Sequence, residues 1–131
     1  MTSTEPRRVV IAEDEALIRM DLAEMLAEEG YVVVGQAADG AAAVDLAEQE
    51  RPDLVILDYA GAGLAAGSAV GSLRDDALTR DAKVLLLVDF AHSADREVAA
   101  SGADERLAMP FSPLQLQVKL RKLLGGDAVG S

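Results

Sequence analysis

Short apolar runs alternate with longer amphipathic segments along this chain. The runs are four to six residues long and consist mainly of Val, Leu, Ile and Ala. Continuous apolar runs of this length are typical of strands that are buried on both faces of a parallel sheet. They predict strands at residues 8–12, 31–35, 54–57, 83–88 and 106–109.

The segments between these runs have the apolar spacing and the end signals of helices. Gly30 follows the first segment, and Ser112 with Gln115 forms the sequence pattern of a capping box before the last one. Asp39 is a candidate N-cap for the second. The predicted helices cover residues 16–29, 39–50, about 69–77, 93–101 and 113–124.

Strands that alternate with helices predict a parallel sheet with helices on both faces. Right-handed crossovers then give a doubly wound α/β fold. The length of 131 residues fits one domain, which we place at residues 8–124. Residues 1–7 are expected to be a disordered lead-in, and residues 125–131 a flexible tail.

Composition narrows the functional classes. The chain has no Cys, which excludes disulfides, thiolate metal sites and Cys nucleophiles. Its net charge of −11 argues against direct nucleic-acid binding by this domain. No apolar run has the length of a membrane span and the first residues do not resemble a signal peptide, so we expect a cytoplasmic protein that does not bind membranes.

Acidic residues follow two of the predicted strands. Glu13 and Asp14 come directly after the first strand, and Asp58 comes directly after the third. If these strands are neighbours, three carboxylates meet at the carboxyl edge of the sheet, where doubly wound folds bind ligands. A divalent cation such as Mg²⁺ would relieve their repulsion. The alternative is that acids simply favour strand ends and the first turn of a helix.

Several motifs together resemble the receiver domain of bacterial two-component response regulators. They are "VVIAEDEALIRMDLAEMLAEEGY", "PDLVILD", "SGAD", "MPF" and the capped last helix. The first sixty residues are most similar to actinobacterial regulators that carry an antiterminator-type RNA-binding domain. The resemblance implies a flavodoxin-like domain with five parallel strands in the order 2-1-3-4-5 and five helices.

The resemblance also implies roles for individual residues. Asp58 matches the aspartate that accepts a phosphoryl group from a histidine kinase. Glu13 and Asp14 match the acidic pair that holds Mg²⁺ together with Asp58, and the carbonyl of Ala60 matches a backbone ligand of the same ion.

Three positions depart from the receiver pattern. Val88 replaces a Thr or Ser whose hydroxyl binds the phosphoryl group, Met109 replaces a Lys, and Arg106 replaces an aromatic switch residue. Val cannot donate a hydrogen bond and Met carries no charge. Arg106 could swing toward the site as a substitute cation. The segment "AGAGLAAG" at 60–67 also lacks the Pro that is usual after the phosphoacceptor.

These observations favour a non-enzymatic signalling domain in which phosphorylation switching is weakened or absent. A fully functional receiver phosphorylated on Asp58 is the alternative, and a small metal-dependent α/β enzyme is a second one. The partners implied by the resemblance are a histidine kinase or another signalling protein. A second copy could also bind through the face formed by the last two helices and the fifth strand.

Overall fold

The computed structural model describes residues 5–59, 64–89 and 96–125. Its centre is a sheet of five parallel strands in the order β2-β1-β3-β4-β5. The predicted fold class and strand order are therefore confirmed. The strands are β1 (Arg8–Ala12), β2 (Val32–Ala37), β3 (Leu54–Asp58), β4 (Lys83–Asp89) and β5 (Glu105–Met109).

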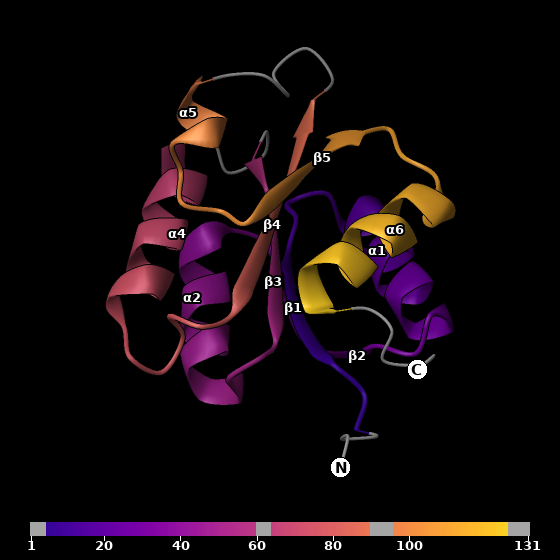
Figure 1. Cartoon of the computed structure of the whole chain (residues 1–131), viewed down its shortest axis with the longest axis horizontal. Coiled ribbons are helices and arrows are strands. Elements are labelled where there is room, and N and C mark those ends of the chain that lie inside the picture. Colours follow the sequence, from indigo (N-terminus) through magenta and orange to yellow (C-terminus); the bar gives the residue numbers. More distant parts are fainter. Residues whose placement is uncertain (1–4, 60–63, 90–95, 126–131) are drawn as a thin grey trace.

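Helices cover both faces of the sheet. Figure 1 shows α1 and α6 on one face and α2, α4 and α5 on the other. Within the described ranges, no helix combines the length and apolar character that a membrane span requires. The helices are α1 (Ala16–Glu28), α2 (Gly40–Glu50), α4 (Leu64–Asp75), α5 (Arg96–Ala99) and α6 (Pro113–Leu124).

Some predicted boundaries are wrong. The helix expected at about 69–77 runs from Leu64 to Asp75, so half of the Gly/Ala segment is helical rather than a loop. It ends before Asp76, whose Oδ1 accepts a hydrogen bond from the N–H of Leu78 at 2.9 Å and forms a turn. The predicted strand 31–35 instead covers Val32–Ala37, because its last residues continue to pair with β1.

Only four of the five expected helices are full-length helices, of 11 to 13 residues. A helix was predicted at 93–101. In the part of this segment that the structure describes, the helix is α5, a single turn of four residues. Residues 100 and 101 form a turn, and Gly102 follows with a φ of +91° that favours glycine. Residues 93–95 lie outside the described residues.

The predicted helix caps are confirmed. Asp39 accepts a hydrogen bond from the N–H of Ala42 at 2.9 Å. Ser112 and Gln115 exchange two hydrogen bonds, from Gln115 N–H to Ser112 Oγ at 3.1 Å and from Ser112 N–H to Gln115 Oε1 at 2.8 Å. These contacts satisfy N–H groups that the first helical turn would otherwise leave without partners.

Aliphatic side chains fill both layers of the core. Strand alternation sends one set of residues toward α1 and α6 and the other toward α2, α4 and α5. The fully buried β3 and the centre of β4 contribute to both layers. This packing gives a rigid frame, and the residues that end β1 and β3 are held by it.

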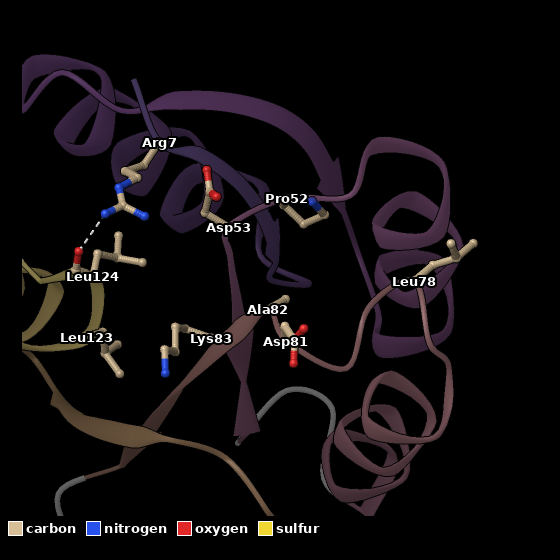
Figure 2. A pocket seen from close by; sticks show the side chains of 9 residues that line it. All are labelled: Arg7, Pro52, Asp53, Leu78, Asp81, Ala82, Lys83, Leu123 and Leu124. Atoms are coloured by element: carbon tan, nitrogen blue, oxygen red, sulfur yellow. Dashed lines mark hydrogen bonds between the residues drawn. The ribbon is translucent and has the colours of Figure 1, made fainter. Parts of the chain in front are cut away.

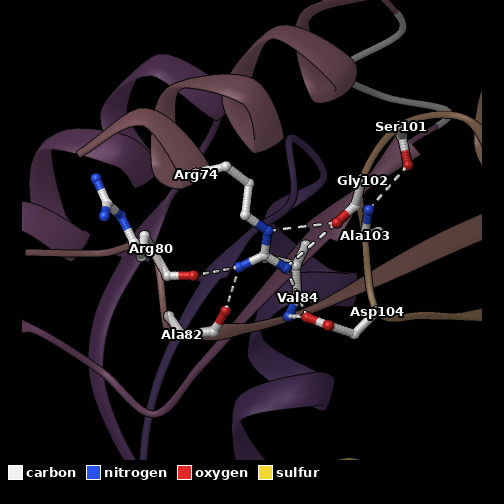
Figure 3. A network of polar contacts seen from close by, with 8 residues as sticks. All are labelled: Arg74, Arg80, Ala82, Val84, Ser101, Gly102, Ala103 and Asp104. Carbon is white, nitrogen blue, oxygen red and sulfur yellow. Dashed lines mark hydrogen bonds and ion pairs between the residues drawn. The ribbon is translucent and has the colours of Figure 1, made fainter. Parts of the chain in front are cut away.

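A network around Arg74 joins three elements at the amino edge of the sheet (Figure 3). The Arg74 guanidinium, on the last turn of α4, donates to the carbonyls of Arg80, Ala82 and Gly102 and forms an ion pair of 2.6 Å with Asp104. Arg74 therefore ties α4 to the segments that lead into β4 and β5.

The Arg74 network predicts a loss of stability when the guanidinium is removed. We expect Arg74→Met to lower the free energy of unfolding by about 1–2 kcal/mol, because charge-assisted hydrogen bonds are lost at a partly exposed site. Urea denaturation measures this loss. Arg80→Met is the control, since Arg80 contributes its main-chain carbonyl to the network. Equal effects of the two substitutions would contradict the prediction.

Candidate functional site

Three carboxylates meet at the carboxyl edge of the sheet. Glu13 and Asp14 follow β1, Asp58 ends β3, and these strands are neighbours. One carboxylate oxygen from each residue lies within 4.8 Å of the other two. Glu13 and Asp58 are buried, with 2% and 5% of their surfaces exposed, whereas Asp14 is exposed. The sequence-predicted acids are thus close together.

Hydrogen bonds hold Glu13 in the turn between β1 and α1. Its N–H donates to the carbonyl of Ala37 on β2 at 3.0 Å, and its Oε2 accepts from the N–H of Glu15 at 3.0 Å. Its carbonyl accepts a bond of 2.6 Å from the guanidinium of Arg19. Its Oε1, however, is buried with no hydrogen-bond partner among the described residues. A buried oxygen of this kind is costly unless a ligand satisfies it.

Burial is the main reason why the pKa of Glu13 is raised, from 4.5 to about 7. The N–H of Glu15 lowers this pKa, but the side chains of Asp14 and Asp58 raise it. The three acids therefore resist full ionisation when no cation balances them.

The donor set fits a hard divalent cation. Three carboxylates converge, one offers a buried oxygen without a partner, and one faces solvent, where a bound ion would keep water ligands. The fourth predicted ligand, the carbonyl of Ala60, lies outside the described residues.

The three atypical positions occupy different places around this edge. Val88 is fully buried and packs in the layer beneath α2 and α4. Met109 is half-buried and packs in the opposite layer, against the cluster formed with α1 and α6. Both positions therefore carry apolar side chains that pack in the core layers.

The structure does not favour Arg106 as a substitute cation. Arg106 pairs with Leu86, which in turn pairs with Leu57, so Arg106 lies one residue before the level of Asp58 and two strands away. Strand alternation also places Arg106 and Asp58 on opposite faces of the sheet.

Arg19 contacts the site although the sequence did not predict it. All twelve Lys and Arg residues lie in the described parts of the chain, and Arg19 is the one seen to donate a hydrogen bond to Glu13. Its position in the first turn of the helix that follows the acids was the available signal. Arg19 binds the main-chain carbonyl of Glu13, however, and the direction of that carbonyl depends on the conformation of the turn between β1 and α1.

A pocket of about 300 Å³ lies at the other edge of the sheet (Figure 2). Arg7 precedes β1, Asp53 precedes β3 and Lys83 begins β4, so the pocket is at the amino ends of the strands. Arg7 donates a hydrogen bond of 2.7 Å to the carbonyl of Leu124 at the end of α6. Ligands of doubly wound folds bind at the carboxyl ends, which favours the acid cluster as the functional site.

Comparison with known proteins identifies relatives over most of the chain. The sequence profile of the response regulator receiver domain matches residues 9–121. Transcriptional regulatory protein PdtaR of Mycobacterium tuberculosis is 49% identical over 108 residues, which are 82% of this chain and 51% of that protein. The phosphate regulon regulator PhoB of Escherichia coli is 31% identical, with 90% of this chain and 52% of PhoB covered. The chain thus spans about half the length of these relatives.

Solved structures agree with this assignment. The receiver domain of sensor histidine kinase PA1611 from Pseudomonas aeruginosa, described with a magnesium ion in its active site cleft, superposes with a TM-score of 0.82 at 30% identity. That match covers 92% of this chain and 99% of the other. Chemotaxis protein CheY4 of Vibrio cholerae gives a TM-score of 0.80 at 27% identity, with 90% and 98% covered. The chain therefore belongs to the response regulator receiver domains, the signalling modules of two-component systems.

Proposed function

We propose that this receiver keeps a metal-binding phosphoacceptor site but has weakened or no coupling between phosphorylation and its interaction surface. Asp58 is the phosphoacceptor position, and Glu13 and Asp14 bind Mg²⁺ with it and with the carbonyl of Ala60. The observation that carries the proposal is the convergence of three carboxylates in a chain whose Val88 and Met109 are apolar and pack in the two core layers.

The residues of the cluster have distinct chemical tasks. A carboxylate oxygen of Asp58 attacks the phosphorus of the donor while the bond from phosphorus to the leaving group breaks and its electron pair departs with that group. A bound Mg²⁺ supplies neutralisation of the charge on the phosphoryl oxygens. Glu13 and Asp14 hold the ion, and the rigid end of β3 fixes the direction of attack.

Positions 88 and 109 carry no polar group that could stabilise a phosphoryl group on Asp58. A hydroxyl at position 88 and an ammonium at position 109 would each make a charge-assisted contact worth roughly 1.5–3 kcal/mol. Val88 and Met109 supply neither. Because the movement of these contacts would transmit phosphorylation, their replacement weakens the signal as well as the reaction.

Ion pairs join β5 to α6 at the amino end of β5, away from the carboxylate cluster. Glu105, the first residue of β5, forms ion pairs of 2.9 Å with Lys119 and Lys122 on α6. Burial raises the pKa of Glu105, but hydrogen bonds from Lys122 and Lys119 outweigh it and lower that pKa to about 2. The ion pairs support a surface that binds partners constitutively.

The partners that we propose are signalling proteins, namely a histidine kinase or another regulatory protein, in the cytoplasm. Leu114 and Val118 are one turn apart on α6 and are 64% and 58% exposed, which supports a homodimer through the α5–β5–α6 surface. The net charge of −11 supports the proposal that this domain does not contact nucleic acid directly.

A fully functional receiver is the second candidate. The observation that favours it is the acid cluster itself, because the three carboxylates converge as a phosphoacceptor site requires. Rates of phosphorylation and the effects of restoring the missing side chains distinguish the two candidates.

The pKa of Glu13 predicts a pH dependence of stability. Because this pKa is raised, the native state holds a proton that the unfolded state has lost, so the unfolding free energy in EDTA should fall as pH rises from 4.5 to about 7. Mg²⁺ needs the ionised carboxylate, so the rise in melting temperature that it causes should be larger at pH 8 than at pH 6. Glu13→Gln should remove both effects. An unchanged Mg²⁺ effect in that variant would contradict the assignment.

Phosphorylation tests the proposed function directly. Wild-type protein treated with Mg²⁺ and acetyl phosphate should form the acyl phosphate slowly or not at all, as measured by intact-mass spectrometry. The double variant Val88→Thr/Met109→Lys should react roughly 100-fold faster, because it restores two contacts worth at least about 1.5 kcal/mol each. Asp58→Asn should form no adduct.

Met109→Lys alone is the companion variant, because its half-exposed position tolerates a charge more readily than the buried position 88. If the wild type reacts as fast as both restored variants, the site is fully functional and the weakened-switch proposal fails.

A further inference from the structure

Three hydrogen bonds hold the turn that carries Glu13 and Asp14. Two of these contacts use main-chain N–H donors: the N–H of Glu13 donates to the carbonyl of Ala37, and the N–H of Glu15 donates to Oε2 of the Glu13 side chain. The third comes from the side chain of Arg19, which donates to the Glu13 carbonyl at 2.6 Å. Arg19 is thus a side-chain contact between α1 and this turn.

The Glu13 carbonyl belongs to the peptide unit that joins the two acids. Rotation of this unit changes the direction in which the Asp14 side chain leaves the backbone. Asp14 is exposed, so core packing does not fix it. A short, charge-assisted bond from Arg19 to the carbonyl restricts the rotation and so sets the direction of the Asp14 carboxylate relative to Glu13.

The positive charge of Arg19 does not favour cation binding at the cluster. The cluster attracts cations, and a guanidinium beside it opposes the binding of another cation. The pKa of Glu13 is set by burial, the Glu15 N–H, Asp14 and Asp58, which is consistent with a guanidinium that faces the carbonyl rather than the carboxylate. Geometry and charge therefore predict opposite effects of removing Arg19.

We propose that Arg19 is a positioning residue for divalent-cation binding, acting through the Glu13–Asp14 peptide. The inference rests on the proposed function, since it requires that the three carboxylates bind Mg²⁺. Partners of metal ligands of this kind typically contribute 10- to 100-fold to metal affinity. Arg19 would thus hold the metal-binding turn in shape while contributing an unfavourable charge.

Calorimetric titration with Mg²⁺ tests the inference on the full chain. Arg19→Met should weaken Mg²⁺ binding by roughly 10-fold, while its melting temperature in EDTA stays close to that of the wild type. Arg19→Lys, which keeps a donor and the charge, should recover part of the affinity. Arg121→Met is the charge-matched control, because Arg121 is exposed on α6, and it should bind as tightly as the wild type or more tightly.

The Mg²⁺ affinities of these variants decide whether Arg19 positions the metal-binding turn. Unchanged or tighter binding by Arg19→Met overturns the positioning role, and so does equal weakening in Arg19→Met and Arg121→Met. Weaker binding in Arg19→Met alone, with partial recovery in Arg19→Lys, supports it. If the wild type does not bind Mg²⁺, both the metal site of the proposed function and this inference fail. If the wild type binds Mg²⁺ and Arg19→Met binds it equally well, only the positioning role fails.

Discussion

Burial of closely spaced carboxylates is the constraint on which the site of this receiver domain depends. Glu13 and Asp58 are buried at the ends of neighbouring strands, and the exposed Asp14 stands beside them. Burial of Glu13, with smaller contributions from Asp14 and Asp58, raises the pKa of Glu13 to about 7, so the cluster is only partly ionised at neutral pH without a counter-charge. The rigid, aliphatic sheet keeps the acids together in spite of this cost. A site that is unfavourable when empty is well suited to bind a cation.

The surroundings of the cluster determine what such a site can transmit. In a receiver with the usual residues, a hydroxyl and an ammonium would connect the phosphoryl group to β4 and β5. Val88 and Met109 instead pack into the apolar layers on either side of the sheet. At the other end of β5, Asp104 and Glu105 are tied to α4 and α6 by ion pairs. We therefore infer a domain that retains its chemical site while its partner-binding surface is stabilised from elsewhere.

Much of this architecture could be predicted from the sequence because burial on both faces leaves a simple pattern. Continuous apolar runs predicted all five strands, and the order of the strands placed Glu13 level with Asp58. The start of α4 at Leu64 could not be predicted, since the Gly/Ala segment before it offers neither a cap nor an apolar stripe. The role of Arg19 was also missed, because a contact with a main-chain carbonyl depends on the conformation of a turn.

Amide hydrogen exchange of the α5–β5–α6 surface tests the central claim most directly. Protection across residues 96–125 would be compared before and after treatment with Mg²⁺ and acetyl phosphate, with intact-mass spectrometry reporting the extent of modification. The account predicts that protection in β5 and α6 changes little, whatever fraction of Asp58 is modified. A large change in protection that follows the modification and is absent in Asp58→Asn would contradict it.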